Sequence, residues 1–333
     1  MKEELTIVET AGAERDPLLC DAVMPLRATF YPLGFALEII TNSAQVLAAA
    51  HESWVRYEKC FDAEPVRLRV GVRGSESEPC PPAPRIHRGW QHLLTTIADA
   101  ENFSVCDLTR GTGYVWLVPA AANDRAYLRY YFLEGAALSL LNNRYMTPLH
   151  AACVQLENRG VLLCGDSGAG KSSLAYACAL RGWTYVADDS CCLIRGRAGR
   201  EVVGNPYQVR FREAGVNLFP ELRAHEPVLR GNGDFAIELD TAKVKGIKTA
   251  LTSTADYVIF LNRREPQPAG LAPFPHDVAL NWFAQVVCYG EDALRREQID
   301  ALHALSGAKI LELRYRDLDW AVDRLAAMVR DGR

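Results

Sequence analysis

A glycine-rich stretch near the middle of the chain has the residue types and spacing that bind phosphate. The segment GDSGAGKS, between an apolar run and a helix-like run, matches the pattern G-x-x-x-x-G-K-[ST]. Glycines let backbone N–H groups curl around phosphate oxygens, and the start of a helix adds partial positive charge. A glycine turn that only precedes a helix is the alternative. The sequence predicts a P-loop whose nucleotide-binding residues are Gly165, Asp166, Ser167, Gly168, Ala169, Gly170, Lys171, Ser172 and Ser173.

Two side chains of this loop have specific expected tasks. Lys171 is placed to reach the β- and γ-phosphates as a point charge, and the Ser172 hydroxyl can join the coordination shell of Mg²⁺. The pattern therefore indicates a site for a nucleotide with magnesium.

Two adjacent aspartates, Asp188 and Asp189, follow the next strand-like run, TYVA. In a parallel sheet this strand would lie beside the strand that leads into the loop, and both would end at the same carboxyl edge. One carboxylate could then hold magnesium while the other takes a proton from an attacking hydroxyl, because a neighbouring acid tends to raise the pKa of one of the two. An acidic pair that only organises the strand end is the alternative.

With the loop and the acids placed, residues 150–189 resemble the catalytic core of HPr kinase/phosphorylase, whose fold is related to that of phosphoenolpyruvate carboxykinase. The likeness rests on GDSGAGKS, on VADD after a helix that ends in RG, and on a histidine fifteen residues before the first loop glycine. It implies that Asp189 is the base, that Asp188 and Ser172 hold the metal, and that His150 assists proton transfer. Taken alone, His150 would more often be a structural histidine.

The resemblance implies an ATP- and Mg²⁺-dependent kinase with Asp189, His150 and Lys171 as catalytic residues. Its acceptor would be a hydroxyl, foremost a serine of a protein or peptide. Ser173 stands where the HPr enzymes usually have Glu, and their Gly-rich segment associated with phosphorolysis is not found. Phosphorolysis is therefore expected to be weak or absent, and the chain looks more like the divergent HPr-kinase-related proteins. The alternatives are a small-molecule kinase, a P-loop ATPase or nucleotide-dependent switch, and a nucleotide-binding module without phosphotransfer.

Basic and polar side chains beyond the acidic pair are further candidates for the site. Arg210 and Arg212, in the alternating run QVRFR, would face one side of a strand and could clamp a phosphate, with a solvated strand face as the alternative. Of the two, Arg210 is predicted to contact the nucleotide. A local basic run and the end of a buried strand supply weaker candidates, which are Lys243, Lys245, Lys248, Asn262, Arg263 and Arg264.

The hydrophobic pattern divides the chain into two predicted domains. Residues 1–145 hold strand-like runs and two helix-like runs, which predicts a smaller α+β domain of unknown role. Residues 146–333 alternate apolar runs with helices, which predicts an α/β catalytic domain, and the resemblance makes this domain phosphoenolpyruvate-carboxykinase-like. Within it, residues 184–194 are expected to form one strand.

Composition limits the kinds of partner. The 333 residues carry a net charge of -4, so no global positive field attracts nucleic acid or an anionic membrane, and neither partner is expected. The start MKEELTIVET does not resemble a signal peptide. The 10 cysteines show no paired C-x-x-C spacing, which favours small buried side chains in a reducing cytoplasm. HPr kinases assemble as hexamers, so the resemblance also implies a homo-oligomer.

Overall fold

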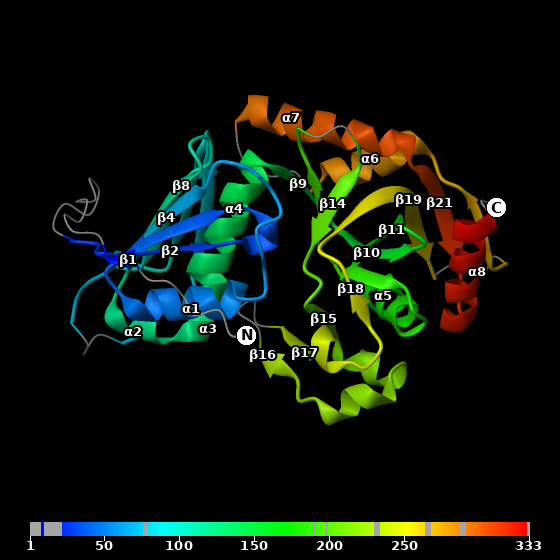
Figure 1. The fold of residues 1–333 in the computed structure, drawn as a ribbon, viewed down its shortest axis with the longest axis horizontal. Coiled ribbons are helices and arrows are strands. Elements are labelled where there is room, and N and C mark those ends of the chain that lie inside the picture. Colours follow the sequence, from blue (N-terminus) through cyan, green and yellow to red (C-terminus); the bar gives the residue numbers. More distant parts are fainter. Residues whose placement is uncertain are drawn as a thin grey trace. The chain divides into compact units, whose positions relative to one another are not determined.

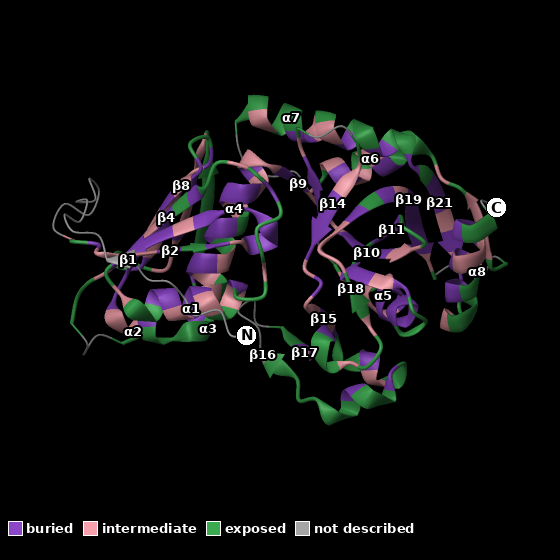
Figure 2. Cartoon of the chain, viewed as in Figure 1, coloured by how far each residue is buried: buried purple, intermediate pink, exposed green. Residues whose placement is uncertain are grey.

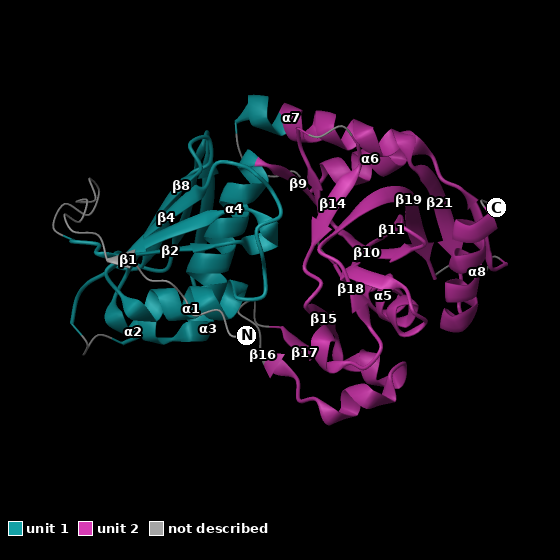
Figure 3. Ribbon diagram, viewed as in Figure 1, with its two compact units in different colours: residues 1–144, 289–295 teal, residues 145–288, 296–333 magenta. Residues whose placement is uncertain are grey.

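The computed structural model describes residues 8–9, 22–75, 79–189, 191–196, 199–229, 234–263, 268–286 and 291–331. It forms a mixed α/β fold with several sheets (Figure 1). The chain divides into two units, residues 1–144 with 289–295 and residues 145–288 with 296–333 (Figure 3). No helix within the described ranges is long and apolar enough to cross a membrane.

The first unit contains one sheet with the strand order β1-β2-β3-β4-β8-β7-β6-β5. Helix α1 contacts β2 and β3, and helix α4 contacts β4, β7 and β8. The elements are β1 (Val8–Glu9), β2 (Leu26–Phe30), η1 (Pro32–Gly34), β3 (Leu37–Thr41), α1 (Ala44–Trp54), β4 (Val66–Val72), β5 (Ile86–Trp90), β6 (Leu93–Ile97), β7 (Phe103–Asp107), β8 (Thr112–Leu117), α2 (Pro119–Asn123), α3 (Arg125–Tyr127), η2 (Leu128–Glu134) and α4 (Gly135–Arg144).

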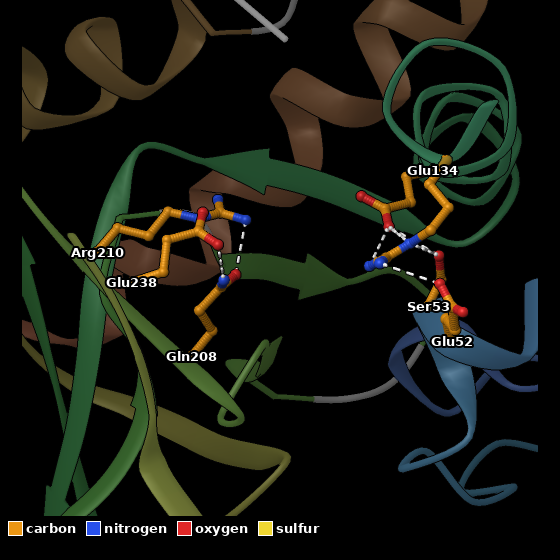
Figure 4. Close-up of polar contacts among 7 residues, drawn as sticks. Glu52, Ser53, Glu134, Gln208, Arg210 and Glu238 are labelled. Atoms are coloured by element: carbon orange, nitrogen blue, oxygen red, sulfur yellow. Dashed lines mark hydrogen bonds and ion pairs between the residues drawn. The ribbon is translucent and has the colours of Figure 1, made fainter. Parts of the chain in front are cut away.

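A polar cluster fastens α1 to η2 within this unit (Figure 4). The Arg129 guanidinium donates to Ser53 Oγ at 2.8 Å and to Glu134 Oε1 at 3.1 Å, and Ser53 Oγ donates to the same Glu134 oxygen at 2.8 Å. Ser53 of α1 is therefore bonded to two side chains of η2, which is typical of a structural contact.

The second unit is built on a mixed sheet with the order β18-β12-β10-β11-β19-β14-β13-β9, in which β21 also pairs with β19 and β20 with β21. Its strands are β9 (Met146–Leu149), β10 (Ala151–Leu156), β11 (Arg159–Cys164), β12 (Thr184–Ala187), β13 (Cys191–Ile194), β14 (Glu201–Gly204), β18 (Lys248–Thr249), β19 (Thr252–Asn262), β20 (Gly270–Pro273) and β21 (Lys309–Arg314). A small sheet has the order β15 (Gln208–Phe211), β17 (Phe235–Asp240), β16 (Val228–Leu229).

The helices of this unit cover both faces of its sheet. They are α5 (Lys171–Leu180), η3 (Glu213–Asn217), η4 (Pro220–Ala224), η5 (Thr241–Lys243), α6 (His276–Ala284), η6 (His303–Gly307), α8 (Leu318–Asp331) and α7 (Asp292–Leu302), which has residues in both units. Strand β11 is buried on both faces (Figure 2). Val161 and Leu163 pack in the cluster that contains α5 and α8, whereas Leu162 packs in the cluster that contains Phe283 of α6. This alternation follows from the period of two in a strand.

Strands β10 and β11 form a tight hairpin that decides the strand order. Leu156 and Arg159 face each other, and the two residues between them, Glu157 and Asn158, have φ angles of 50° and 62°. Two left-handed residues in succession are typical of the two-residue turn that matches the twist of a hairpin. Strand β10 therefore occupies one side of β11, and β19 occupies the other in parallel.

The prediction that β11 and β12 are adjacent in the sheet is wrong, because β10 lies between them. Strand β10 is antiparallel to both, so β11 and β12 run in the same direction and end at the same edge, as predicted. The run at 184–194 is also not one strand. Strand β12 ends at Ala187 and β13 begins at Cys191, which leaves the two aspartates in the connection between them.

Candidate functional site

The glycine-rich loop connects β11 to α5 and has a backbone that needs its glycines. Gly165, Gly168 and Gly170 have φ angles of 142°, 87° and 100°, and Gly170 is the N-cap residue of α5. Residues with a side chain rarely adopt these angles. Helix α5 begins directly after this loop. The partial positive charge at its N-terminus favours binding of an anion there.

Lys171 brings three segments of the second unit together. Its Nζ donates to Gly165 O at 2.9 Å, lies 2.9 Å from His150 Nε2, and forms an ion pair with Asp189 Oδ1 at 3.2 Å. The side chain is only 5% exposed. The structure therefore gathers the loop lysine, the histidine and one aspartate of the acidic pair into one cluster.

His150 immediately precedes β10, so the antiparallel direction of that strand brings the ring to the edge where β11 ends. Its ring lies 6.0 Å from the ring of Trp282, between centroids. Burial lowers the pKa of His150, and the nearby Lys171 ammonium lowers it further, while Asp189 acts in the opposite direction. Because Lys171 has only donors, Nε2 of the neutral ring accepts its hydrogen bond. The ring proton is then on Nδ1, which lies 3.7 Å from Asp189 Oδ1.

The two aspartates have different surroundings. Asp189 is exposed and faces the lysine and the histidine. Asp188 is half-buried, its Oδ2 accepts a hydrogen bond from Arg210 N at 2.7 Å, and its backbone oxygen lies 3.4 Å from Ser172 Oγ. Burial raises the pKa of Asp188 to about 6, although the hydrogen bond from Arg210 N opposes the rise.

Ser172 and Asp188 together have the chemistry of a magnesium site. Both offer oxygen atoms, which Mg²⁺ prefers, and Mg²⁺ in nucleotide sites is held by one or two carboxylates together with phosphates and water. The described part of the chain contains no group of three or more His, Cys, Asp or Glu side chains that could hold a metal ion. Ser172 and Asp188 would therefore supply two oxygen ligands to an ion that also takes phosphate oxygens and water.

Arg210 and Arg212 do not form the expected pair on one strand face. The Arg210 guanidinium lies 3.1 Å from Glu238 Oε1 and donates to Gln208 Oε1 at 2.7 Å (Figure 4). Strand β15 ends at Phe211, so Arg212 no longer follows the alternation, and its guanidinium donates to Ser167 Oγ in the loop at 2.6 Å. Contact of Arg210 with a nucleotide stays a prediction, as do the roles assigned to the other loop residues.

The weaker candidates have different environments. Three of them, Lys243, Lys245 and Lys248, are exposed. Asn262 donates to Glu312 Oε1 at 2.9 Å. The Arg263 guanidinium lies 5.5 Å from the ring centre of Tyr315, whereas Arg264 is outside the described residues.

Two aromatic residues near the loop and the histidine were not found from the sequence. Trp282 packs against His150, and Tyr315 Oη lies 3.0 Å from the position that a Cβ on Gly170 would take. Tyr315 directly follows β21, and its position at the carboxyl end of a buried strand was the only available signal.

No protein-family model and no curated protein matches the chain. Among solved structures, the chain is similar to the Hpr(Ser) kinase/phosphatase from Coxiella burnetii, with 15% sequence identity. The match covers 56% of this chain and 95% of that chain, with a TM-score of 0.29. A likeness at this level carries no conclusion about activity, so function has to follow from the residues described above.

Proposed function

We propose that the chain is a kinase that binds ATP with Mg²⁺ at residues 165–173 and transfers the γ-phosphate to a hydroxyl, foremost a serine of a protein or peptide. The observation that supports this proposal best is the meeting of Lys171, His150 and Asp189 at the loop. A phosphoryl transferase needs a cation for the phosphates and a base for the acceptor, and this cluster offers both.

Lys171 supplies the positive charge. Its ammonium is held by the loop carbonyl of Gly165 and by Asp189. The phosphate oxygens of ATP are stronger acceptors than a neutral carbonyl, because hydrogen bonds between charged groups are the stronger ones. Binding of ATP would therefore draw the ammonium away from the Gly165 carbonyl and toward the phosphates.

Asp189 is the proposed base. Its carboxylate is 56% exposed, so the hydroxyl of an acceptor can approach it. The Nδ1 proton of His150 faces the same carboxylate and would orient it, and it would also stabilise its charge before the proton is taken. When Lys171 moves toward the phosphates, His150 Nε2 loses its donor and can accept another proton.

Magnesium would be held by Ser172 and Asp188, and when bound it would neutralise charge on the transferred phosphate. Asp188 is the residue whose carboxylate already has a fixed orientation, because Arg210 N donates to it. The two acids would thus divide the work, one holding the metal and the other accepting the proton.

The same cluster could activate water, which would make the chain an ATPase, and a small-molecule hydroxyl could replace the serine. The proposal is tested with γ-labelled ATP, a lysate of the native host, and the variant Asp189→Asn. We expect phosphate transfer to fall by roughly 10²–10⁴-fold, the effect of a lost general base, while calorimetry shows nearly unchanged Mg-ATP affinity.

Asp300→Asn is the matched control, because Asp300 is an exposed aspartate of α7. It should transfer phosphate at the wild-type rate. Wild-type transfer by Asp189→Asn with normal binding would show that the base is another residue. Release of labelled phosphate by the wild type without any labelled acceptor would favour the ATPase, and binding without turnover would favour the binding module.

A further inference from the structure

A cavity of about 400 Å³ lies at the carboxyl ends of two neighbouring strands of the second unit. Its walls come from the end of β19, the end of β21 and the start of α8, through Asn262, Arg314, Tyr315, Arg316, Asp317 and Trp320. This volume is within the range of sites for small molecules, roughly 300–1,000 Å³.

The cavity and the glycine-rich loop share one edge of the sheet. Strands β11, β19 and β21 are parallel neighbours, so the loop after β11 and the residues after β21 emerge on the same side. Tyr315 joins the two places. It lines the cavity, and its hydroxyl lies against Gly170, the last residue before α5.

We infer that this cavity binds the purine base and the ribose of a nucleotide whose phosphates occupy the loop at 165–172. The inference rests on the proposed function, since it assumes that the loop binds phosphates. It goes further by assigning the place in the fold where the base and the ribose bind and the residues that contact them. Ligands of open α/β sheets bind outside the carboxyl ends of the strands, which is where both parts of the nucleotide would lie.

The walls of the cavity suit a flat base that carries an amino group. Trp320 is 36% exposed, and an indole at the rim can stack on a base. Asp317 Oδ1 caps α8 by accepting from Trp320 N at 2.7 Å. The second oxygen of the same carboxylate is an acceptor that matches an exocyclic amino group, as in adenine and guanine. A two-ring base offers the larger stacking surface, which is why we assign a purine.

The hydroxyl of Tyr315 is an independent sign of a ligand. Tyr315 is 3% exposed, and its Oη has no hydrogen-bond partner within the described part of the chain. Burial raises the pKa of Tyr315 to about 12, so the hydroxyl keeps its proton and remains a donor at neutral pH. A buried donor without an acceptor costs free energy, and an oxygen of a ribose or phosphate beside the loop would satisfy it.

The inference is tested by calorimetry of wild type and Trp320→Ala with three Mg²⁺-loaded ligands: ATP, UTP and inorganic tripolyphosphate. Wild type should bind ATP more tightly than tripolyphosphate, which has no base, and more tightly than UTP, whose base has one ring and no amino group. Trp320→Ala should weaken ATP binding by roughly 5- to 100-fold, the range for a lost stacking contact, and leave tripolyphosphate unchanged.

Two further variants complete the test. Trp320→Phe keeps an aromatic ring and should retain most of the ATP affinity. Trp90→Ala removes a tryptophan that is 63% exposed in the first unit and should bind every ligand as wild type does.

The outcomes separate this inference from the proposed function. Equal affinity of wild type and Trp320→Ala for ATP would overturn the assignment of the cavity while the phosphate site stands. The same holds if wild type binds ATP no more tightly than tripolyphosphate or UTP, a comparison that does not depend on the folding of any variant. If wild type binds neither tripolyphosphate nor ATP, the loop itself binds no phosphates, and both proposals fall.

Discussion

Each of the two edges of the sheet in the second unit carries a cavity, but the polar groups near the two cavities differ in their partners. The edge opposite the loop has the larger cavity, of about 530 Å³, where Gln155 and Ser253 hydrogen-bond to each other at 3.0 Å. Arg200 at this edge donates to Ala255 O at 2.8 Å and pairs with Asp256 at 3.6 Å. These side chains use one another and the backbone as partners, as in a structural contact.

The loop edge has a smaller cavity and a buried polar group without a hydrogen-bond partner. Tyr315 Oη is buried without a partner in the described chain, whereas the ammonium of Lys171 contacts a carbonyl, a ring nitrogen and a carboxylate. Cavity volume and the proposed site therefore do not coincide, since the larger cavity lies at the edge opposite the loop. Groups that remain available to a ligand are the better criterion.

Removal of Lys171 should have a much larger effect than any change at the opposite edge. Lys171→Ala takes away the point charge over the phosphates, so we expect phosphate transfer to fall by at least roughly 10²-fold, by analogy with the loss of one transition-state donor. Arg200→Ala, at the opposite edge, should transfer phosphate at the wild-type rate. Turnover and calorimetry with Mg-ATP give the measurement, and a Lys171→Ala variant unchanged in both would show that the loop is not a nucleotide site.

Replacing a glycine by alanine should have different effects at the two edges: it should lower stability at one and weaken nucleotide binding at the other. A Cβ on Gly160, where β11 begins, would clash with the carbonyl oxygen of Thr254, whereas a Cβ on Gly168 would meet no atom within 4 Å. Gly160→Ala should therefore lower the free energy of unfolding by about 1–3 kcal/mol, the cost of overpacking, and leave the Mg-ATP affinity of the folded protein intact.

Gly168→Ala should show the reverse behaviour, because its φ of 87° is needed by the loop backbone. We expect weaker Mg-ATP binding and a stability loss of about 1 kcal/mol. Denaturant unfolding and calorimetry on both variants provide the measurement. The comparison breaks down if Gly160→Ala weakens nucleotide binding more than Gly168→Ala does.

A further prediction concerns pH and Asp188. Its pKa is about 6 in the folded chain, above the value of roughly 3.9 expected in the unfolded chain. Between these values the unfolded state has already lost the proton and the folded state retains it, so rising pH lowers the stability contributed by this group. Between pH 4 and 7, wild type should therefore lose on the order of 1–2 kcal/mol more than Asp188→Asn, with allowance for partial exposure.

Urea unfolding at a series of pH values measures this difference, and Asp300→Asn should follow wild type. Parallel stability curves for wild type and Asp188→Asn would show that burial does not perturb the Asp188 carboxyl. Such a result would leave the exposure of the two carboxylates and the hydrogen bond from Arg210 N as the differences between the two acids.

The parts of the site that the sequence predicted are local ones. The glycine spacing requires a loop of this shape before α5, and the order of strand, helix and strand predicts that the loop and the acidic pair lie at one edge. The position of β10 between β11 and β12 was not predictable in this way, because the pairing partner of a strand depends on tertiary contacts and not on its local sequence.

The partners of charged and polar side chains could not be predicted from the sequence either. Arg210 was expected at a phosphate because its neighbours in the sequence alternate, but its guanidinium meets Glu238 of a different strand. Tyr315 contacts the loop although it is distant from Gly170 in the sequence, and neither spacing nor periodicity relates the two residues. Contacts between distant segments depend on the packed sheet, and local propensity does not encode them.

The short turn between β10 and β11 has a consequence for how the gene for this protein can change. The turn sets Ala151 opposite Cys164, and His150 and Gly165 are the next residues at the open end of the hairpin. Because the turn fixes the register, a residue inserted within β10 would move every earlier side chain of that strand to the other face of the sheet, and the preceding histidine would no longer point as it does. An insertion between Glu157 and Asn158 would lengthen only a surface turn. Changes in length are therefore expected to accumulate at the turn and to be excluded from the two strands.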